Sequence, residues 1–375
     1  MAQVINTNIA SLNAQRNLNS TQSQLQTSLT RLSSGLRVNS AKDDAAGLAI
    51  AERFSTQVKG LTVASRNAND AISLSQTAEG AMGEIGNNLQ RIRELAVQSA
   101  NHTNSAGDRE ALNNEVRQLV NEIDRVAAQT DFNGTRLLDG SFSGALFQIG
   151  ANAGQTISVN NIVNAQAQAL GGVKFADTVT ATMAGNAEAT DLSLNGVKIA
   201  SVESTGTAEG NAKALAAAVN ERMDRHGVWA EVVDGNQVTL HSIKGNTDLV
   251  ISGSSLGGFN AGTTSAADSA ITATDALDVS TFQGSQRAIE IATAALTEVN
   301  TARSEMGAVQ NRFESVIANL ATTNENLTSS RSRIEDADFA AETAALTRSQ
   351  ILTQAGTAML AQANTMPQSV LSLLQ

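Results

Sequence analysis

Apolar residues recur every seven positions in the last quarter of the chain, and no other feature restricts the fold as strongly. They are Ala292, Val299, Met306, Phe313, Leu320, Leu327 and Ile334. A seven-residue apolar repeat is typical of an α-helical coiled coil. The companion heptad row is half polar and comprises Ile289, Leu296, Arg303, Gln310, Ile317, Asn324 and Arg331. One such face cannot bury itself, so other parts of this chain or other chains must cover it.

The polar members of the companion row have two interpretations that the sequence leaves open. Arg303, Gln310 and Asn324 are either solvated edges of the helix or residues that fix the register between subunits or allow more than one packing. In both cases the function depends on helix packing.

Composition also favours long uninterrupted helices. The chain contains one proline, Pro367, where an average content of about 5% would give roughly nineteen. Aromatic residues make up 3% of the chain, with no tyrosine and a single tryptophan, Trp229. Aliphatic side chains must therefore do most of the packing.

Charge and residue content exclude several classes of function. The net charge is −11, and no Lys/Arg cluster with interleaved aromatics appears, so we expect no nucleic-acid partner. Cysteine is absent, which excludes disulfides and thiolate metal sites. No apolar run reaches the roughly 18 residues of a membrane span, so we expect no membrane insertion. The N-terminus has no basic start before an apolar run, so we expect no cleaved secretory signal.

The first half of the chain predicts three helices. The first, to about residue 39, carries leucines at heptad and four-residue spacings, at Leu18, Leu25, Leu29, Leu32 and Leu36, and breaks near Gly35. Ser40 with Asp43 and Ser105 with Asp108 predict capping boxes for the next two helices. Their apolar stripes are Ala78, Met82, Ile85, Leu89, Ile92 and Ala96, then Leu112, Val116, Leu119, Ile123 and Val126. We expect these two helices to pack as a hairpin.

The pattern changes after Thr130 to short apolar runs separated by glycine turns. Asn133-Gly134 and Asn195-Gly196 predict β-hairpins, and residues 231–240 suggest another. Residues 176–275 hold 12 acidic and 5 basic residues, or −7 of the net charge. A helix with Ala212, Leu215, Val219 and Met223 lies among these strands. The sequence therefore predicts a small α+β domain inserted between two helical halves.

These patterns give a mainly α fold class, with long antiparallel terminal helices forming coiled-coil layers, β-hairpins after the second helical segment and a small inserted α+β domain. We expect three domains: a terminal coiled-coil inner core, 1–40 plus 335–375; a helical rod with β-hairpins, 41–175 plus 276–334; and a variable, surface-exposed insert, 176–275. The helical sequence resumes near 283 and runs to about 362. Both ends lack enough apolar surface to order alone, so we expect them to fold when subunits assemble. The residues expected to carry subunit assembly are Leu18, Leu25, Leu29, Leu32, Leu36, Met359, Leu371, Leu373 and Leu374.

Both ends of the sequence closely resemble bacterial flagellin, the subunit of the flagellar filament. The resemblance covers about 1–175 and 276–375, and the middle is similar to the family's variable surface-exposed insert. The matching segments are MAQVINTNIASLNAQRNL at 1–18, LSSGLRVNSAKDDAAGLAIAERF at 32–54, LQRIRELAVQSAN at 89–101, residues 121–140, RSRIEDADFAAET at 331–343 and residues 350–375. Phe339 departs from the tyrosine that is frequent in the family.

The resemblance implies a structural subunit, exported unfolded through the flagellar type III apparatus, that polymerises into an extracellular filament used for swimming motility. It implies as partners other flagellin subunits, an export chaperone bound at about 340–375, the filament cap and the hook–filament junction proteins. It also implies recognition by a host Toll-like receptor through residues matching Arg91, Leu95 and Glu115. The tail around Leu371, Leu373 and Leu374 is similar to a segment recognised by a cytosolic flagellin sensor.

Other functions fit the sequence less well. The three histidines, His102, His226 and His241, are scattered, and no nucleophile or phosphate-binding motif appears, so we expect neither an enzyme nor a cofactor or metal. A hook–filament junction protein would share the terminal helices, and a secreted adhesin or binding protein would use the acidic insert. The length of the match through both halves favours the filament subunit.

Overall fold

The computed structural model describes residues 7–160, 162–254 and 257–371 of the chain. It is mainly α with small β-rich parts, which confirms the predicted fold class. The chain forms two compact units. The first comprises residues 1–68, 148–156 and 315–375, and the second comprises 69–147 and 157–314. The two longest helices, α2 (Ala45–Ser99) and α6 (Phe282–Glu335), contribute residues to both units.

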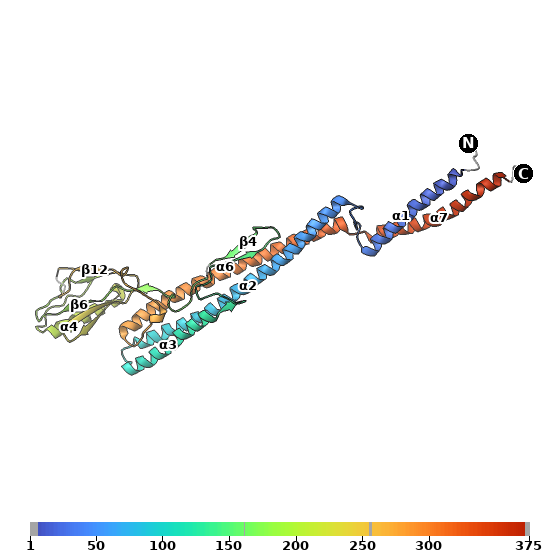
Figure 1. Ribbon diagram of the computed structural model, residues 1–375. Coiled ribbons are helices and arrows are strands. Elements are labelled where there is room, and N and C mark those ends of the chain that lie inside the picture. The colour runs from blue at the N-terminus through green and yellow to red at the C-terminus, as the bar shows by residue number, and fades with distance from the viewer. Residues whose placement is uncertain (1–6, 161, 255–256, 372–375) are drawn as a thin grey trace. The chain divides into compact units, whose positions relative to one another are not determined.

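The terminal helices α1 (Ile9–Ser34) and α7 (Phe339–Leu371) lie side by side in the first unit (Figure 1). They run antiparallel, because Asn8 Nδ2 donates to the Ala363 carbonyl (2.7 Å) while Arg31 lies 3.9 Å from Glu342. The side chain of Asn8 caps α1 by accepting from Ser11 N–H. The helix ends at Gly35, whose φ of 73° suits glycine at a left-handed C-cap. The predicted break at Gly35 is confirmed.

A second break divides the C-terminal helical sequence. Residues 336–338 separate α6 from α7, where the sequence predicted helical structure from 283 to about 362. Backbone hydrogen bonds tie this break to the one after α1, from Arg37 N to Glu335 O (2.6 Å) and from Ala337 N to Gly35 O (2.9 Å). Pro367, by contrast, lies inside α7 and does not end it.

The start of α2 corrects one predicted cap. Ser40 and Asp43 form a turn in which Asp43 Oδ2 accepts from Ser40 N (2.9 Å) and Oγ (3.1 Å). These bonds lower the pKa of Asp43. The helix itself begins two residues later, and Asp44 Oδ1 accepts from Gly47 N–H at 2.8 Å. Asp44 is therefore the capping residue, because a cap must reach the free N–H groups of the first turn.

The long helices of the second unit are α3 (Ala106–Gln129), the 69–99 part of α2 and the 282–314 part of α6. The capping box of Ser105 and Asp108 is present, as predicted. The predicted stripe on α2 is fully buried from Ala78 to Ala96. On α3 the stripe differs, because Leu112, Leu119 and Val126 are only half-buried. The buried residues of α3 are Asn113, Val116, Val120, Ile123 and Ala127.

A cluster of buried hydrogen bonds around Val279, which we call the polar knot, explains why the buried stripe of α3 differs from the predicted one. The Oδ1 of Asn113 accepts from Val279 N–H at 3.0 Å, while the Val279 carbonyl accepts from Ser99 Oγ (2.5 Å) and Ser285 Oγ (3.2 Å). Asn113, Ser99, Ser285 and Val279 are all buried. The polar knot holds the chain just before α6 begins. Asn113 of α3 therefore faces the core in place of Leu112.

Short hairpins follow α3. Asn133 and Gly134, with φ of 51° and 78°, form the turn of the predicted hairpin β1–β2, and β3 and β4 pair in a second two-stranded sheet. Phe147 of β3 packs edge-on against Phe313 of α6, with ring centroids 5.8 Å apart. The strands are β1 (Asp131–Phe132), β2 (Thr135–Arg136), β3 (Ala145–Gln148) and β4 (Thr156–Val159).

The acidic middle segment folds around a hydrophobic core of its own. One sheet has the order β6-β10-β9, a second has the order β12-β11-β7-β8, and β5 pairs with β13. The strands are β5 (Val173–Lys174), β6 (Val179–Thr182), β7 (Ser193–Leu194), β8 (Val197–Lys198), β9 (Val228–Val233), β10 (Gln237–Ser242), β11 (Leu249–Ser252), β12 (Gly262–Thr264) and β13 (Ile271–Thr272). The helices are α4 (Ala208–Asn220), α5 (Met223–His226) and the 3-10 turn η1 (Thr274–Ala276). The predicted hairpins at Asn195-Gly196 and within 231–240 are confirmed.

In this segment Ala212, Leu215 and Val219 of α4 are buried in the same core as Val238 and Leu240 of β10. Met223, predicted on the same helix, belongs instead to the short α5 and is half-buried.

Candidate assembly surface

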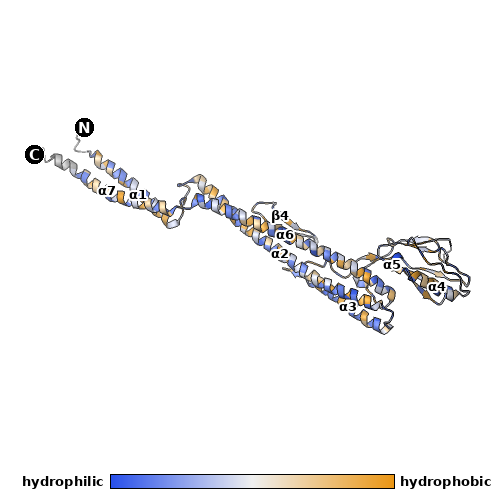
Figure 2. Ribbon diagram, turned by 180° about the vertical axis from the view of Figure 1, so that it is seen from behind, coloured by the Kyte–Doolittle hydropathy of each residue, from blue (hydrophilic) through white to orange (hydrophobic). Residues whose placement is uncertain are grey.

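The pair of helices α1 and α7 leaves most of its apolar side chains open to solvent. Hydrophobic residues recur along both helices (Figure 2). Among their described side chains the buried ones are small: Ser28, Ser349 and Ala363. Two helices in contact can shield only the strip between them, so the outer flanks of each helix stay uncovered.

The structure places the predicted assembly residues at the edges of this strip. Leu18, Leu25, Leu32 and Leu36 are half-buried. Leu29 is 49% exposed and Met359 is 63% exposed. Leu373 and Leu374 lie outside the described residues, and although Leu371 ends α7, its side chain is not described.

Further exposed apolar residues belong to the same surface and were missed from the sequence. They are Ile9, Leu12, Phe339, Ile351 and Leu352, with exposed fractions from 47% to 67%. Leu12 lies outside the heptad rows of the α1 leucines, and Ile351 and Leu352 belong to no obvious heptad, because α7 is apolar on more than one side. They could have been predicted from the sequence by counting every large apolar residue of the two terminal helices, not only those at heptad spacing. We call the exposed apolar residues of α1 and α7, with Leu29 and Met359, the terminal apolar surface.

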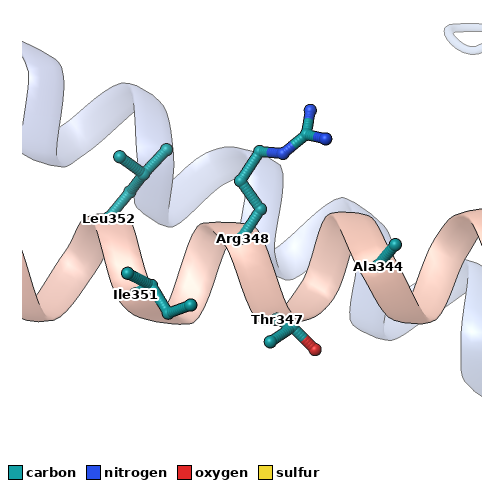
Figure 3. Close-up of a pocket in the computed structure, with 5 residues that line it drawn as sticks. All are labelled: Ala344, Thr347, Arg348, Ile351 and Leu352. Carbon is teal, nitrogen blue, oxygen red and sulfur yellow. The ribbon is translucent and has the colours of Figure 1, made fainter.

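Two shallow hollows lie on this surface. One, of about 520 Å³, is lined by Ala344, Thr347, Arg348, Ile351 and Leu352 of α7 (Figure 3). The other, of about 440 Å³, runs between the helices and includes Leu18 of α1 with Leu352 and Met359 of α7. A Cβ on Gly356 would lie 3.2 Å from Leu18 Cδ1, so the glycine permits the close approach of the two helices. Both hollows can receive apolar side chains of another helix.

The heptad row of α6 is covered to different extents along the helix. In the second unit Val299, Met306 and Phe313 are buried at 0 to 3% exposure. In the first unit Leu320 is 9% exposed and packs with Leu61 and Ala64 of α2, whereas Leu327 and Ile334 are half-buried. Within this chain, the heptad side chains are therefore fully buried in the first part of α6 and only partly buried near its end.

Polar residues of the companion row pair with a residue of α2. Gln310 Nε2 donates to Glu79 Oε2 at 2.9 Å, and Arg303 Nη2 lies 3.9 Å from Glu79 Oε1. Both contacts hold α6 in register against α2 inside one chain. They show that Arg303 and Gln310 have partners within the subunit, while a role of this row in the register between subunits stays a prediction.

Arg91, Leu95 and Glu115, which the sequence resemblance connects with receptor recognition, lie close together in the second unit. Arg91 of α2 pairs with Glu115 of α3, with Arg91 Nη2 and Glu115 Oε1 2.9 Å apart, and Arg91 also contacts Glu94 at 3.2 Å. These hydrogen bonds raise the pKa of Arg91, mainly through Glu115. Leu95 is 1% exposed, so it belongs to the buried core and not to the accessible surface.

The described residues hold no obvious chemical site. No group of three or more His, Cys, Asp or Glu among them could hold a metal ion. His226 is buried, where its Nδ1 accepts from Val228 N–H (3.1 Å) and its Nε2 contacts the Val219 carbonyl (2.9 Å), and burial lowers its pKa. In the part of the chain that the structure describes, no helix combines the length and the hydropathy needed to cross a membrane.

Comparison with known proteins places these surfaces in context. The N-terminal helical region of bacterial flagellin matches residues 5–143, and the C-terminal helical region of bacterial flagellin matches residues 289–374. Flagellin D of Vibrio anguillarum is 44% identical over 393 aligned positions, and polar flagellin C of Vibrio parahaemolyticus is 41% identical over 397. Both alignments cover all of this chain and all of the relative.

A solved structure, FliC from Burkholderia pseudomallei, is 26% identical and aligns with 64% of this chain and 99% of that chain, with a TM-score of 0.40. The matches to the family regions and to full-length relatives extend over both helical ends and through the middle segment. The chain therefore belongs to the bacterial flagellins, a family of structural proteins, not enzymes, that polymerise into the flagellar filament for motility.

Proposed function

We propose that the terminal apolar surface, together with Leu18, Leu25, Leu32, Leu36 and the tail residues Leu371, Leu373 and Leu374, is where neighbouring subunits pack in the filament. The observation that carries the proposal is the exposure of large apolar side chains on both helices, such as Ile351 (60%) and Met359 (63%). Exposed apolar side chains that recur along paired helices favour an interface, because burying them is favourable and no described part of this chain covers them.

We further propose that α1 and α7 become fully ordered only during assembly. Ordering each residue costs roughly 1 to 2 kcal/mol of backbone entropy, and among the described side chains of this pair only small ones are fully buried in return. Helical hydrogen bonds offset only part of that cost. A chain with such ends is suited to export in an unfolded form through the flagellar type III apparatus to the cell exterior, with an export chaperone covering about 340–375 in the cell.

The same reasoning supports three domains for the assembled subunit. The breaks at Gly35 and at 336–338 support a boundary between a terminal core, 1–40 plus 335–375, and a helical rod, 41–175 plus 276–334. The hydrophobic core shared by residues between Ala176 and Ala266 supports a distinct outward-facing insert at 176–275. In this arrangement the filament cap and the hook–filament junction proteins are the partners of the first and last subunits of the polymer.

Seeded polymerisation tests the assembly proposal. Purified chain is mixed with filament seeds and followed by light scattering and electron microscopy, beside versions lacking residues 1–40 or 340–375. A sharper variant is Ile351→Glu, matched by Ser201→Glu on an exposed residue of the insert. We expect the truncations and Ile351→Glu to stop elongation and Ser201→Glu to elongate normally. Normal elongation of Ile351→Glu would show that this face is not an interface. A full-length chain that never elongates would favour a junction protein.

We also propose that a host Toll-like receptor binds the α2–α3 surface around Arg91 and Glu115. The two charged groups are accessible and mutually paired, and Leu95, one turn of α2 after Arg91, is buried. A receptor carboxylate and a receptor cation could each replace one partner of the pair. A receptor reporter assay with Arg91→Ala tests this, with Arg125→Ala as the matched control, because Arg125 on α3 forms a similar exposed pair with Glu122. An equal response to both variants would contradict the assignment.

A further inference from the structure

Two Asn-Gly dipeptides occur in the sequence, and both form the turn of a two-residue hairpin. Asn133 and Gly134 have φ of 51° and 78°, and Asn195 and Gly196 have φ of 48° and 77°. The same dipeptide therefore stands in the same backbone conformation at two places in the chain. Any difference in their chemistry must come from their surroundings.

The side chain of Asn195 is held at both ends of its amide. Its Oδ1 accepts from Val250 N–H at 2.8 Å, and its Nδ2 donates to the His226 carbonyl at 2.8 Å. Its backbone N–H donates to the Val250 carbonyl at 2.9 Å. The preceding Leu194 is fully buried in a four-stranded sheet. The Asn195 amide cannot rotate unless this part of the insert opens.

The side chain of Asn133 is free by comparison. It is exposed, and within the described residues its amide has no hydrogen-bond partner. Its hairpin consists of two-residue strands alone, and a Cβ on Gly134 would meet nothing within 4 Å. The backbone N–H of Gly134 donates to Asp131 Oδ2 at 3.1 Å. A short exposed hairpin of this kind opens at little cost in free energy.

We propose that Asn133 is a site of spontaneous deamidation and that Asn195 is protected from it. The Gly134 nitrogen attacks Asn133 Cγ, and its proton passes to the Asp131 carboxylate. The N–Cγ bond forms, the Cγ–Nδ2 bond breaks, and Nδ2 leaves as ammonia after taking up that proton. Water then opens the resulting succinimide at either carbonyl, which gives aspartate or isoaspartate. The reaction needs no oxidant, and glycine favours it because no side chain shields the attacking nitrogen.

The product alters the hairpin. Either product adds a negative charge next to Asp131, and isoaspartate also adds a methylene to the backbone of a turn whose two central residues have positive φ. The strand after this turn leads directly to Leu137 and Leu138, which are fully buried. Deamidation therefore changes charge and turn geometry beside the core of the second unit.

The structure also sets the expected difference in rate between the two sites. Asn195 must break two side-chain hydrogen bonds before its Cγ can face the next nitrogen. The expected slowing is roughly 30-fold, which corresponds to about 2 kcal/mol.

The test is prolonged incubation of the full-length chain in mildly alkaline buffer, followed by acidic proteolysis and mass spectrometry that separates asparagine, aspartate and isoaspartate peptides. A parallel sample in urea is the matched control, because unfolding removes the surroundings of both sites. We expect Asn133 to react roughly 30-fold faster than Asn195 in buffer and both to react at similar rates in urea. Equal rates in buffer, or an Asn133 that reacts only in urea, would overturn the proposal.

A variant tests the part assigned to Asp131. Asp131→Asn keeps a hydrogen-bond acceptor of the same shape but cannot take up the proton. We expect a several-fold slower reaction at Asn133 and an unchanged rate at Asn195. An unchanged rate at Asn133 would remove Asp131 from the step.

Discussion

The α1–α7 pair and the helices of the second unit differ in how completely one chain covers them. In the second unit Met82, Ile85, Leu89 and Ile92 are all 0% exposed. On α7, Ile351 is 60% and Met359 is 63% exposed, although both helices have similarly apolar residues. The difference teaches that helical sequence alone does not define a core. The number of neighbours that one chain supplies decides whether an apolar face is buried.

The surroundings of the two regions explain the difference. Both α3 and α6 contact α2, through Arg91 with Glu115 and through Glu79 with Gln310. The α1–α7 pair has no third element of this chain against it among the described residues. In the proposed assembly, neighbouring subunits cover the faces that this pair leaves exposed.

The largest effect is expected from a cavity in the second unit. Ile85→Ala removes a fully buried side chain, and large-to-small substitutions of this kind cost about 2 to 5 kcal/mol. Denaturant unfolding of the monomer, followed by circular dichroism, measures the change. An effect below about 1 kcal/mol would mean that the second unit is as loosely packed as the ends, since that is the size of an average point substitution.

The next effect is a loss of stability in acid, and it distinguishes the insert from the terminal helices. Burial, followed by the charge of Arg287, lowers the pKa of His241 to about 4. Glu231 lies 3.5 Å from Nε2, but it is half exposed and does not offset these two effects. Because the folded state prefers neutral His241, its stability is complete above the unfolded pKa of about 6.5 and falls by up to roughly 3 kcal/mol as the pH drops to about 4.

Trp229 reports this change directly. It is the one tryptophan of the chain, and its ring stacks on His241 with centroids 5.3 Å apart. Urea unfolding followed by tryptophan fluorescence should shift to lower urea between pH 6.5 and 4. His241→Phe keeps the stack and removes the titration, so most of the shift should disappear. The remainder belongs to His226 and to carboxylates with a lowered pKa such as Asp191 and Glu209. A wild-type midpoint that stays flat over this pH range would contradict the prediction.

Local signals in the sequence predicted much of this fold. The two hairpins were predicted correctly from Asn133-Gly134 and Asn195-Gly196, because the positive φ angles of the turn depend on two adjacent residues alone. The α2 stripe was correct because its spacing leaves one apolar face. The cap at Asp44 was missed, because Ser40 and Asp43 have the spacing of a capping box but form the turn before the helix.

What depends on distant residues could not be predicted. Burial of Asn113 in place of Leu112 depends on Val279, 166 positions further along the chain. The break at 336–338 contains neither glycine nor proline and is instead held by hydrogen bonds to residues 35 and 37. For the candidate site, the leucines of α1 were found from their spacing, whereas Ile351 and Leu352 follow no heptad.

A third, smaller effect is expected at the polar knot. Asn113→Ala leaves the buried N–H of Val279 without its acceptor, and an unsatisfied buried donor costs about 1 to 3 kcal/mol. Hydrogen exchange should show faster exchange at Val279 while α1 and α7 are unchanged. Asn114→Ala is the control, because the neighbouring amide is exposed. Equal destabilisation by the two variants would show that the knot adds nothing.

The smallest effect on the monomer is expected where the effect on assembly is large. Met359 is 63% exposed, and an exposed substitution of this kind changes the stability of a monomer by no more than about 0.5 kcal/mol. In a filament the same side chain would be covered, and full burial of methionine contributes about 1.5 to 3 kcal/mol. Met359→Ala should therefore leave the unfolding of the monomer unchanged and raise the concentration of subunit needed for seeded growth.

Ile85→Ala should do the reverse wherever its monomer still folds: it should lower monomer stability strongly and change growth little. If each variant changes both monomer stability and the subunit concentration needed for growth, the two regions do not differ as their burial indicates. The second unit would then not be a core complete within one chain, in contrast to terminal helices covered by other chains.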